Sequence, residues 1–433
     1  MKKLNLCLTF CMTSCMAVLG QGEATHDLSY YIRQAHEYSP LIKDYQKRTE
    51  ADEAHLQQLR SLYTRSTVEA NGEWLFVPVV ERAGGGHAFR WNAQDGTDYW
   101  GYDLGESSGH LHAGVTWSQP LLGRSTLRVA QEQHAASAES NSHLARMEKH
   151  QLERTVTEQY LLCLQDQIDR QYADSISRLL EEQKVVVERL VQNGLLKTSD
   201  LRLLNIEREA QDERATAARQ AYKTHLSELH LLCGMQDEGE GELPLVQLEM
   251  QTWQEGESLF ARQFMLDSLQ EHLALKAFRQ QYKPRLNLFA NGGLQTSMPR
   301  QWYRHFGVSA GLTLAWTLYD GHQMKWQRRQ TEARLSTLDT YRTHAEYQRR
   351  MRMEQCLEQM RGYDERARAL EGQIAEYGHV LDTYMKEIKA GQVSVLDYLT
   401  VLRNRTEAEH QHRLLLTNRL LVIAAYNYWN WKE

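Results

Sequence analysis

The six prolines of the chain are placed so that two very long stretches contain none. The first runs from Leu121 to Leu243, 123 residues, and the second from Arg300 to the end, 134 residues. A proline inside a helix costs about 3 kcal/mol, so its absence over such lengths favours uninterrupted helices. Apolar residues in the first stretch keep a coiled-coil spacing, as at Leu161, Leu164 and Ile168. We therefore predict helices of about 60 residues, which would be about 90 Å long.

A short motif interrupts both helical stretches. It spans Gln192–Leu201 and then Ala390–Leu399, and in each copy a glycine is followed six residues later by an aspartate. The two glycines, Gly194 and Gly391, are 197 residues apart. Glycine supplies the left-handed residue that ends a helix, and Ser or Asp caps the next one. Each copy therefore predicts a tight turn that joins two antiparallel helices into a hairpin.

Strand-like segments precede each hairpin and repeat with the same offset. We expect strands at about 66–77 and 110–119 in the first half, and at about 285–294 and 306–317 in the second. Gly311 follows Gly114 by 197 residues, the same separation as the tip glycines. Two independent features with one offset indicate an internal repeat. The Gly- and aromatic-rich segment between the first two strands is interpreted as a long loop, with room for further strand.

These boundaries divide the chain into three parts. Residues 1–24 have the charged start, apolar run and small residues of a secretory signal peptide, and a lipid anchor at Cys15 is an alternative. The first repeat covers 25–243, with its hairpin tip at 192–201. The second repeat covers 244–433, with its tip at 390–399. Within each repeat the order is helix, strands, very long helix, turn and return helix, and Pro40 is expected to break or bend the first helix.

Such a chain cannot pair the two edge strands of its own sheet. An open sheet edge in lipid leaves backbone groups unsatisfied, and single-chain transmembrane barrels begin at about eight strands. We therefore expect a mainly α protein with a small β part, in which four transmembrane strands per chain close a twelve-stranded barrel as a homotrimer. The long helical hairpins would form an α-barrel in the same trimer.

The strand-to-helix joints carry the most specific motifs of the sequence. They are Gly114–Gly123 (GVTWSQPLLG) and Gly311–Gly321 (GLTLAWTLYDG). With both tips, they resemble the TolC-type outer-membrane efflux proteins over essentially all of the mature chain. The resemblance implies a passive trimeric duct in the outer membrane with a large periplasmic part. It also implies a periplasmic adaptor (membrane fusion protein) and an inner-membrane pump as partners, in efflux or type I secretion of small molecules.

The resemblance also assigns roles to individual residues. It implies that the tips dock on the adaptor and that Asp397 lines the periplasmic entrance, where a trimer would present a ring of three carboxylates. The sequence departs from the family pattern at Thr400, where a second aspartate is expected, and at Val393, where a basic latch residue is expected. We therefore predict a less firmly latched entrance. The tip residues implied in docking are Gly194, Leu195, Ser199, Asp200, Gly391 and Ser394.

Other site chemistry is weakly supported. Cys163 and Cys233 would sit almost level on the two arms of one hairpin, so a disulfide and a pair of small buried residues both remain open. His110 with His112, and His410 with His412, lack the neighbouring ligands of a metal site. The formal net charge of -6 gives no nucleic-acid footprint. No phosphate loop or nucleophile motif occurs, so we expect no enzyme and no cofactor.

One alternative of a different class is a periplasmic coiled-coil adaptor or scaffold without a pore. Adaptors usually carry one helical hairpin and have no need for two strand pairs. The sequence leaves open the transported substrate, the pump class, the resting open or closed state, and whether the loop from Phe76 to His110 occludes the outer mouth.

Overall fold

The structure is a computed structural model. It describes residues 26–74, 79–83, 86–90, 111–236, 241–253, 256, 258–296, 303, 306–389 and 393–432. The expected signal peptide, Cys15, His110, Gly391 and most of the loop between the first two expected strands lie outside these residues.

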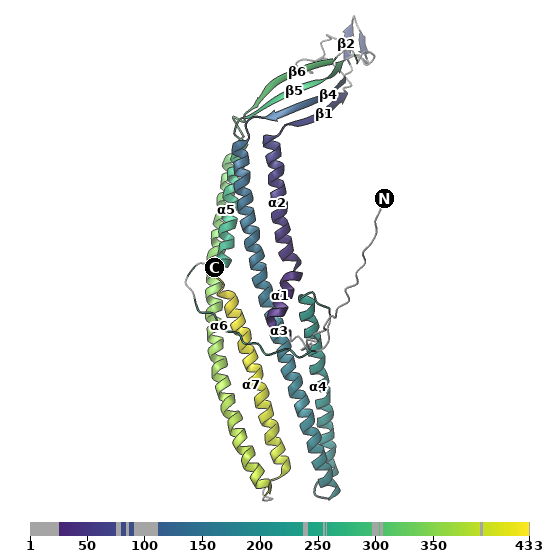
Figure 1. Cartoon of the computed structure of the whole chain (residues 1–433), viewed down its shortest axis with the longest axis vertical. Coiled ribbons are helices and arrows are strands. Elements are labelled where there is room, and N and C mark those ends of the chain that lie inside the picture. The colour runs from purple at the N-terminus through teal and green to yellow at the C-terminus, as the bar shows by residue number, and fades with distance from the viewer. Residues whose placement is uncertain are drawn as a thin grey trace, which may run out of the picture. The chain divides into compact units, whose positions relative to one another are not determined.

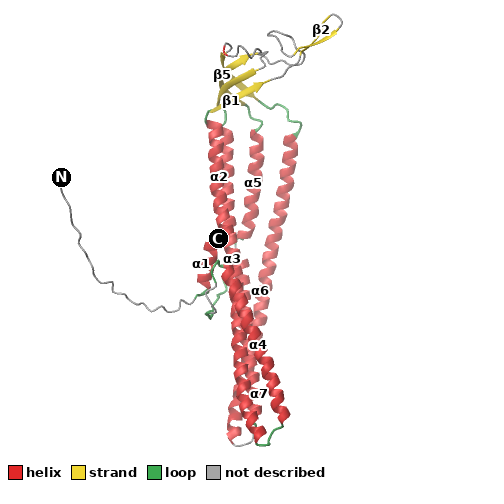
Figure 2. Cartoon of the chain, turned by 90° about the vertical axis from the view of Figure 1, so that its right-hand side faces the viewer, coloured by secondary structure: helices red, strands yellow, loops and turns green. Residues whose placement is uncertain are grey.

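The described chain is mainly helical with a small sheet, as expected (Figures 1 and 2). The helices are α1 (Leu28–Tyr38), α2 (Pro40–Thr64), α3 (Arg124–Gln192), α4 (Thr198–Leu232), α5 (Leu259–Gln280), α6 (Gln323–Lys389) and α7 (Val395–Trp429). The strands are β1 (Thr67–Trp74), β2 (Val79–Ala83), β3 (Gly86–Arg90), β4 (Leu111–Pro120), β5 (Arg285–Thr296) and β6 (Phe306–Ala315).

Proline and capping residues explain where the first helices begin and end. Pro40 stands at the first position of α2, where its missing N–H would have no helical partner anyway. The Ser39 hydroxyl accepts a hydrogen bond from the Ile42 amide at 3.5 Å. The expected break at Pro40 is therefore a full separation into α1 and α2.

Four strands form one antiparallel sheet in the order β1-β4-β5-β6, and β2 pairs with β3 separately (Figure 1). The first-repeat strands β1 and β4 pair with each other, as do the second-repeat strands β5 and β6. A ladder of ten residue pairs from Leu111↔Thr296 to Pro120↔Asn287 joins β4 to β5 and so joins the two repeats.

The chain divides into two compact units. The hairpin unit contains Met1–Tyr38, Thr155–Glu249 and Gly362–Leu421, and the sheet unit contains Ser39–Arg154, Met250–Arg361 and Val422–Glu433. Helices α3 and α6 contribute residues to both units, so this division cuts across the two sequence repeats.

The core of the hairpin unit lies between α3 and α4. Leu161 and Leu164 of α3 and Leu226 and Leu229 of α4 are almost fully buried. Burial of each such side chain stabilises the fold by about 1.5–3 kcal/mol. The steps of three and four residues on both helices keep these side chains on one stripe. The long arms are therefore held together by a continuous apolar seam.

Hydrogen bonds and one ion pair hold the connection between the repeats against this core. Gln167 donates to the carbonyl of Leu243 at 3.2 Å and accepts from its amide at 2.8 Å. The Tyr160 hydroxyl donates to the Pro244 carbonyl at 2.7 Å. Arg170 pairs with Glu242 at 2.7 Å. Residues 242–244 are therefore bound along α3.

The aromatic C-terminus packs in the sheet unit. The His150 ring stacks on Tyr428 and on Trp431, with centroid distances of 4.9 and 4.3 Å. Its Nε2 donates to the Tyr428 carbonyl at 3.0 Å. Burial lowers the pKa of His150 below its usual value. These rings hold the last residues of the chain against α3.

Among the described residues, no helix combines the length and the apolar character that a membrane crossing requires.

Candidate functional site

The first hairpin reverses at Gly194 (Figure 1). The φ angle of this residue is +73°, in the left-handed region. The Leu195 amide donates to the Leu190 carbonyl at 2.8 Å, and the Gly194 amide donates to the Val191 carbonyl at 3.0 Å. These two bonds make a Schellman cap. No atom lies within 4 Å of a Cβ placed at Gly194, so the backbone conformation alone requires glycine here.

The next helix is stabilised by Asp200, the third residue of α4. Its Oδ2 accepts from the Lys197 amide at 3.1 Å, and the Ser199 hydroxyl donates to Oδ1 at 3.3 Å. Lys197 occupies the N-cap position and has no side-chain acceptor. The carboxylate therefore supports the helix start from inside the first turn, where the helix dipole favours a negative charge.

The second tip is described from Val393 onward. The Ser394 hydroxyl accepts from the Leu396 amide at 3.1 Å, which makes Ser394 the N-cap of α7. Asp397 is the third residue of α7, the position that Asp200 holds in α4. Its side chain is exposed and makes no hydrogen bond or ion pair with a described residue. The second tip thus presents a free carboxylate next to its capped helix start.

Thr400 and Val393, the two residues of this tip that depart from the pattern given above, are both uncharged. The Thr400 hydroxyl is directed back to the carbonyl of Leu396 on its own helix, at 2.9 Å. The Val393 side chain is half-buried. Neither residue contributes an ion pair, so any coupling between the hairpins has to come from other residues.

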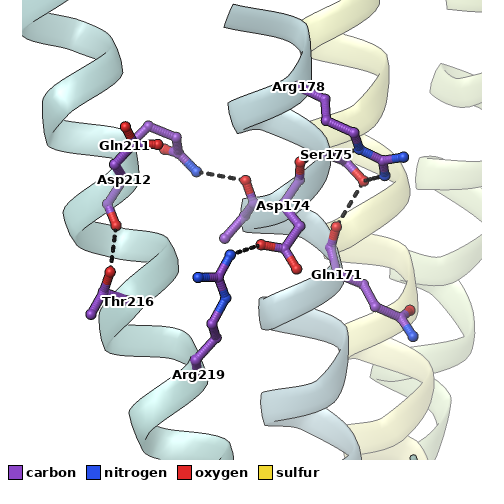
Figure 3. A network of polar contacts seen from close by, with 9 residues as sticks. Gln171, Asp174, Ser175, Arg178, Gln211, Asp212, Thr216 and Arg219 are labelled. Carbon is purple, nitrogen blue, oxygen red and sulfur yellow. Dashed lines mark hydrogen bonds and ion pairs between the residues drawn. The ribbon is translucent and has the colours of Figure 1, made fainter. Parts of the chain in front are cut away.

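The first hairpin is also tied internally by polar side chains that reach from α4 to α3 (Figure 3). Arg219 pairs with Asp174 at 2.7 Å, and the buried Gln211 donates to the carbonyl of Ala173 at 3.3 Å. Arg178, on α3 itself, donates to the Ser175 hydroxyl at 3.4 Å. Exposed ion pairs contribute only about 0.2–1 kcal/mol each, so these contacts mainly fix the register of the two arms.

Of the two alternatives for the cysteines, the structure shows a pair of buried side chains and not a disulfide. Cys163 and Cys233 are free thiols and are buried, so the structure contains no disulfide between them. The Cys233 thiol donates to the carbonyl of Tyr31 at 3.3 Å. Burial raises the pKa of both thiols to about 12. Cys356 is a third buried free thiol.

The histidines that suggested metal ligands have other neighbours. His410 Nε2 lies 2.6 Å from Asp169, and His412 Nε2 lies 3.2 Å from Glu371. Within the described part of the chain, no cluster of three or more His, Cys, Asp or Glu side chains is arranged to hold a metal ion. The two histidines therefore act as single polar links between helices.

The four-stranded sheet has one apolar and one polar face. Strand residues alternate between faces, and the pairing register places equivalent residues side by side. Val308 and Leu312 on the apolar face remain 78% and 62% exposed. The apolar face carries Val68, Ala70, Ala113, Val115, Trp117, Leu286, Leu288, Ala290, Leu294, Phe306, Val308, Ala310, Leu312 and Leu314.

The opposite face carries small and polar side chains with one aromatic ring among them. The Phe289 ring covers Gly311, its neighbour across the strands, and a Cβ added at Gly311 would lie 2.9 Å from this ring. The polar face carries Thr67, Glu69, Asn71, Gly114, Thr116, Ser118, Asn287, Phe289, Asn291, Ser309, Gly311 and Thr313.

The sheet also has two open edges. β1 and β6 each pair on one side only among the described strands. Each edge therefore presents unpaired N–H and C=O groups, which are a template for another strand. An exposed apolar face next to two free edges is not a stable arrangement for a sheet in water.

Comparison with known proteins gives the fold. No family model and no curated protein sequence matches the chain. Among solved structures, CusC, described in terms of its transmembrane channel formation, matches 95% of this chain and 93% of its own, with TM-score 0.69 and 13% identity. The CmeC outer membrane channel of Campylobacter jejuni matches 99% and 94%, with TM-score 0.68 and 11% identity. VceC, an outer membrane protein of Vibrio cholerae, matches 92% and 96%, with TM-score 0.63 and 15% identity. The chain has the fold of TolC-type outer-membrane channels.

Within this TolC-type fold, the two hairpins are linked by residues that the sequence patterns do not single out. Arg403 of α7 pairs with Glu207 of α4. His410 of α7 pairs with Asp169 of α3 at 2.6 Å and stacks on Tyr172 at a centroid distance of 4.1 Å. The only sequence signal was the abundance of charged residues on all arms, which does not indicate which of them meet.

The Tyr172 hydroxyl and the Glu407 carboxylate form a further hydrogen bond between α3 and α7. Burial alone raises the pKa of Glu407, but hydrogen bonds from Tyr172 and Gln411 and the nearby His410 outweigh it, so the pKa is lowered. Burial, followed by the Glu407 carboxylate, raises the pKa of Tyr172. The TolC-type hairpins are therefore joined by links in which the tyrosine donates and the glutamate is ionised.

Proposed function

We propose that the protein is the outer-membrane channel of a tripartite efflux or type I secretion system, a passive homotrimeric duct that exports small molecules across the periplasm and outer membrane. The observation that carries the proposal is the two-faced sheet with open edges. An exposed apolar face suits lipid, and a polar face suits a water-filled interior. Several of the neighbouring structures, CmeC among them, are outer membrane channels by their own descriptions, which supports the same location.

The open edges explain why three copies are required. Backbone groups at a sheet edge cannot stay unpaired in lipid, so β1 of one copy has to pair with β6 of the next. Three copies then supply the strands of a twelve-stranded barrel.

The surface of α6 supports neighbouring copies along the helices as well. Its buried residues form one narrow stripe, with Arg349, Met353, Cys356 and Met360 at steps of four, three and four. Outside this stripe, Tyr341, Tyr347, Met351, Val380 and Met385 are exposed. In the proposed trimer, helices of the adjacent copy cover this apolar surface and complete the α-barrel.

The tips are the proposed contact with a periplasmic adaptor, which in turn engages an inner-membrane pump. Leu195 at the first turn is 70% exposed, and Leu203 and Ile206 on the following helix are 66% and 63% exposed. The proposed docking residues are Gly194, Leu195, Ser199, Asp200, Gly391 and Ser394. The free carboxylate of Asp397 would stand in the periplasmic entrance, where three copies form an acidic ring.

The experiment that tests the channel uses two neighbouring residues on opposite faces of β6. Leu312→Lys puts a charge on the proposed lipid face, which near the bilayer midplane costs about 2–4 kcal/mol. Thr313→Lys puts the same charge on the proposed lumen face. We expect Leu312→Lys to lower the yield of detergent-extracted trimer severalfold. Thr313→Lys should assemble normally and shift single-channel current in planar bilayers toward anions.

Two results would count against the proposal. Equal effects of the two lysines would mean that the faces do not separate lipid from water. Release of the wild-type protein with the soluble periplasmic fraction, without detergent, would favour the adaptor or scaffold alternative.

A further inference from the structure

The sheet unit contains a cavity of about 810 Å³ where its strands meet the helices. The ends of α2 and α5, the start of α3 and the adjoining strand ends of β4 and β5 line it. All of these segments belong to the sheet unit. The volume lies within the range of about 300–1,000 Å³ that is typical of small-molecule sites.

Three cationic side chains line this cavity, from Arg124, Lys283 and Arg285, and no carboxylate does. None of the three forms an ion pair or hydrogen bond with a described side chain. By contrast, most other arginines of the sheet unit that have a contact reach an Asp, a Glu or an aromatic ring. Three uncompensated positive charges around one cavity, in a chain of net charge -6, concentrate anions there.

The rest of the lining is largely apolar. Leu62, Leu121, Leu122 and Ala277 contribute to the wall, and Leu121 and Leu122 are 47% and 51% exposed. The cavity therefore offers an apolar wall and a cationic rim.

The strand register indicates which side of the sheet the cavity adjoins. Pro120 of β4 pairs with Asn287 of β5, and both line the cavity. Asn287 and Arg285 alternate with Leu286 and share the polar face of the sheet. If that face borders the duct, as the proposed function has it, a solute leaving the helical part meets this cavity before the strands.

We propose that this cavity binds a drug-sized anionic amphiphile: an apolar body with one carboxylate, sulfonate or phosphate. The acid group lies among Arg124, Lys283 and Arg285, and the apolar body lies against Leu121 and Leu122. The inference deepens the proposed function by naming a class of exported substrate. The binding itself does not require transport.

A fluorescence titration tests the binding on purified protein in zwitterionic-lipid nanodiscs. The probe is dansyl-undecanoic acid, which carries a carboxylate and an apolar chain. Its methyl ester is the uncharged control. We expect the acid to bind about tenfold more tightly than the ester, since a hydrogen bond that involves a charged group is worth about that ratio. The triple variant Arg124→Gln, Lys283→Gln, Arg285→Gln should lose this preference.

A matched triple variant controls for net charge. Arg60→Gln, Arg328→Gln, Arg350→Gln removes three exposed cations of the same unit that do not line the cavity, and it should bind the acid like the wild type. Ala277→Trp keeps all the charges and places a large side chain on the apolar wall of the cavity, so it should weaken the binding of acid and ester alike. This variant keeps the test decisive if the first triple variant does not fold.

Three outcomes would overturn the inference. One is that the first triple variant binds the acid as tightly as the wild type does. Another is that the control triple variant loses as much affinity for the acid as the first triple variant does. The third is a co-purifying anionic phospholipid, detected by native mass spectrometry, that the acid cannot displace, since the site would then hold a membrane lipid. Normal single-channel current without acid binding would reject only this inference, and binding without current would reject only the proposed channel.

Discussion

At the scale of single residues, Gly194 holds a backbone conformation that favours glycine. Its φ of +73° is one that residues with a Cβ adopt only at a cost of about 1–2 kcal/mol. No neighbouring atom crowds the position, so the cost of a substitution is purely conformational. The first tip therefore depends on one glycine rather than on side-chain packing.

We expect Gly194→Ala to loosen the cap of α3. A cost of about 1 kcal/mol corresponds to about fivefold faster hydrogen exchange of the Leu195 and Leu196 amides, which bond to the Leu190 carbonyl. Hydrogen–deuterium exchange of tip peptides measures this. The control is Gly362→Ala, which lies inside α6 with free space around it and should slow local exchange, because alanine favours helix. Faster exchange in both variants would contradict the conformational argument.

The buried thiols give a second prediction at this scale. Burial raises the pKa of Cys163 and Cys233 to about 12, so the folded state favours the protonated thiol. Their contribution to stability is complete below the ordinary thiol pKa and is lost as the pH rises toward 12. At about pH 8, N-ethylmaleimide should leave both residues unlabelled in folded protein and label both in urea without reductant. Absence of labelling in urea would reveal a disulfide.

At the scale of elements, the ends of helices and strands were largely predictable. The second tip is expected at 390–399, and α6 ends at Lys389 while α7 begins at Val395. The four strands of the main sheet lie within a few residues of their expected positions. Prolines and turn residues mark these boundaries directly in the sequence. The β2–β3 hairpin lies in the segment that is interpreted as a long loop with room for further strand, where the glycines at 84–86 obscure any alternation.

The links between elements were not predictable to the same degree. The pairing of Arg403 with Glu207 depends on how each arm is rotated about its axis, and charged residues recur along both arms. The two faces of β5 were equally hidden, because Gly292 and Gly293 interrupt its alternation of apolar and polar residues. Only the observed register assigns each residue to a face.

The α3–α7 link predicts a response to acid. Because the pKa of Glu407 is lowered from 4.5 in the fold, its contribution to stability is present above that value and is lost as the pH falls through the folded pKa. We expect the hydrogen-exchange rate of α7 peptides near Glu407 to rise as the pH falls from 5 to about 3, when it is compared with the rate in helical segments that lack such a link. Glu407→Gln should flatten this rise, and Glu354→Gln, on the exposed face of α6, should not. An unchanged pH response in Glu407→Gln would exclude this role.

At the scale of the whole molecule, the proposed trimer places three copies of each side chain around one axis. Asp397 is exposed at the second tip, and no described residue pairs with it. Three copies around one axis would place three negative charges in the entrance, a site that attracts cations. In a lone chain the same carboxylate would be an ordinary surface group.

We expect Asp397→Ala to weaken the block of single-channel current by divalent or trivalent cations added from the tip side by at least about tenfold, because the ring is the binding charge. The measurement is conductance in planar bilayers at increasing cation concentration. Asp382→Ala, an exposed aspartate of α6 close to the same tip, is the matched control and should leave the block unchanged. Equal block in wild type and Asp397→Ala would place the constriction elsewhere.

The lengths of the hairpin arms restrict how such a chain can change over generations. The outgoing helices have 69 and 67 residues, and both return helices have 35. A deletion in one arm would rotate every later side chain by about 100° per residue and shift it by about 1.5 Å. We therefore expect insertions and deletions to be tolerated mainly in steps of about seven residues, made together in all four arms.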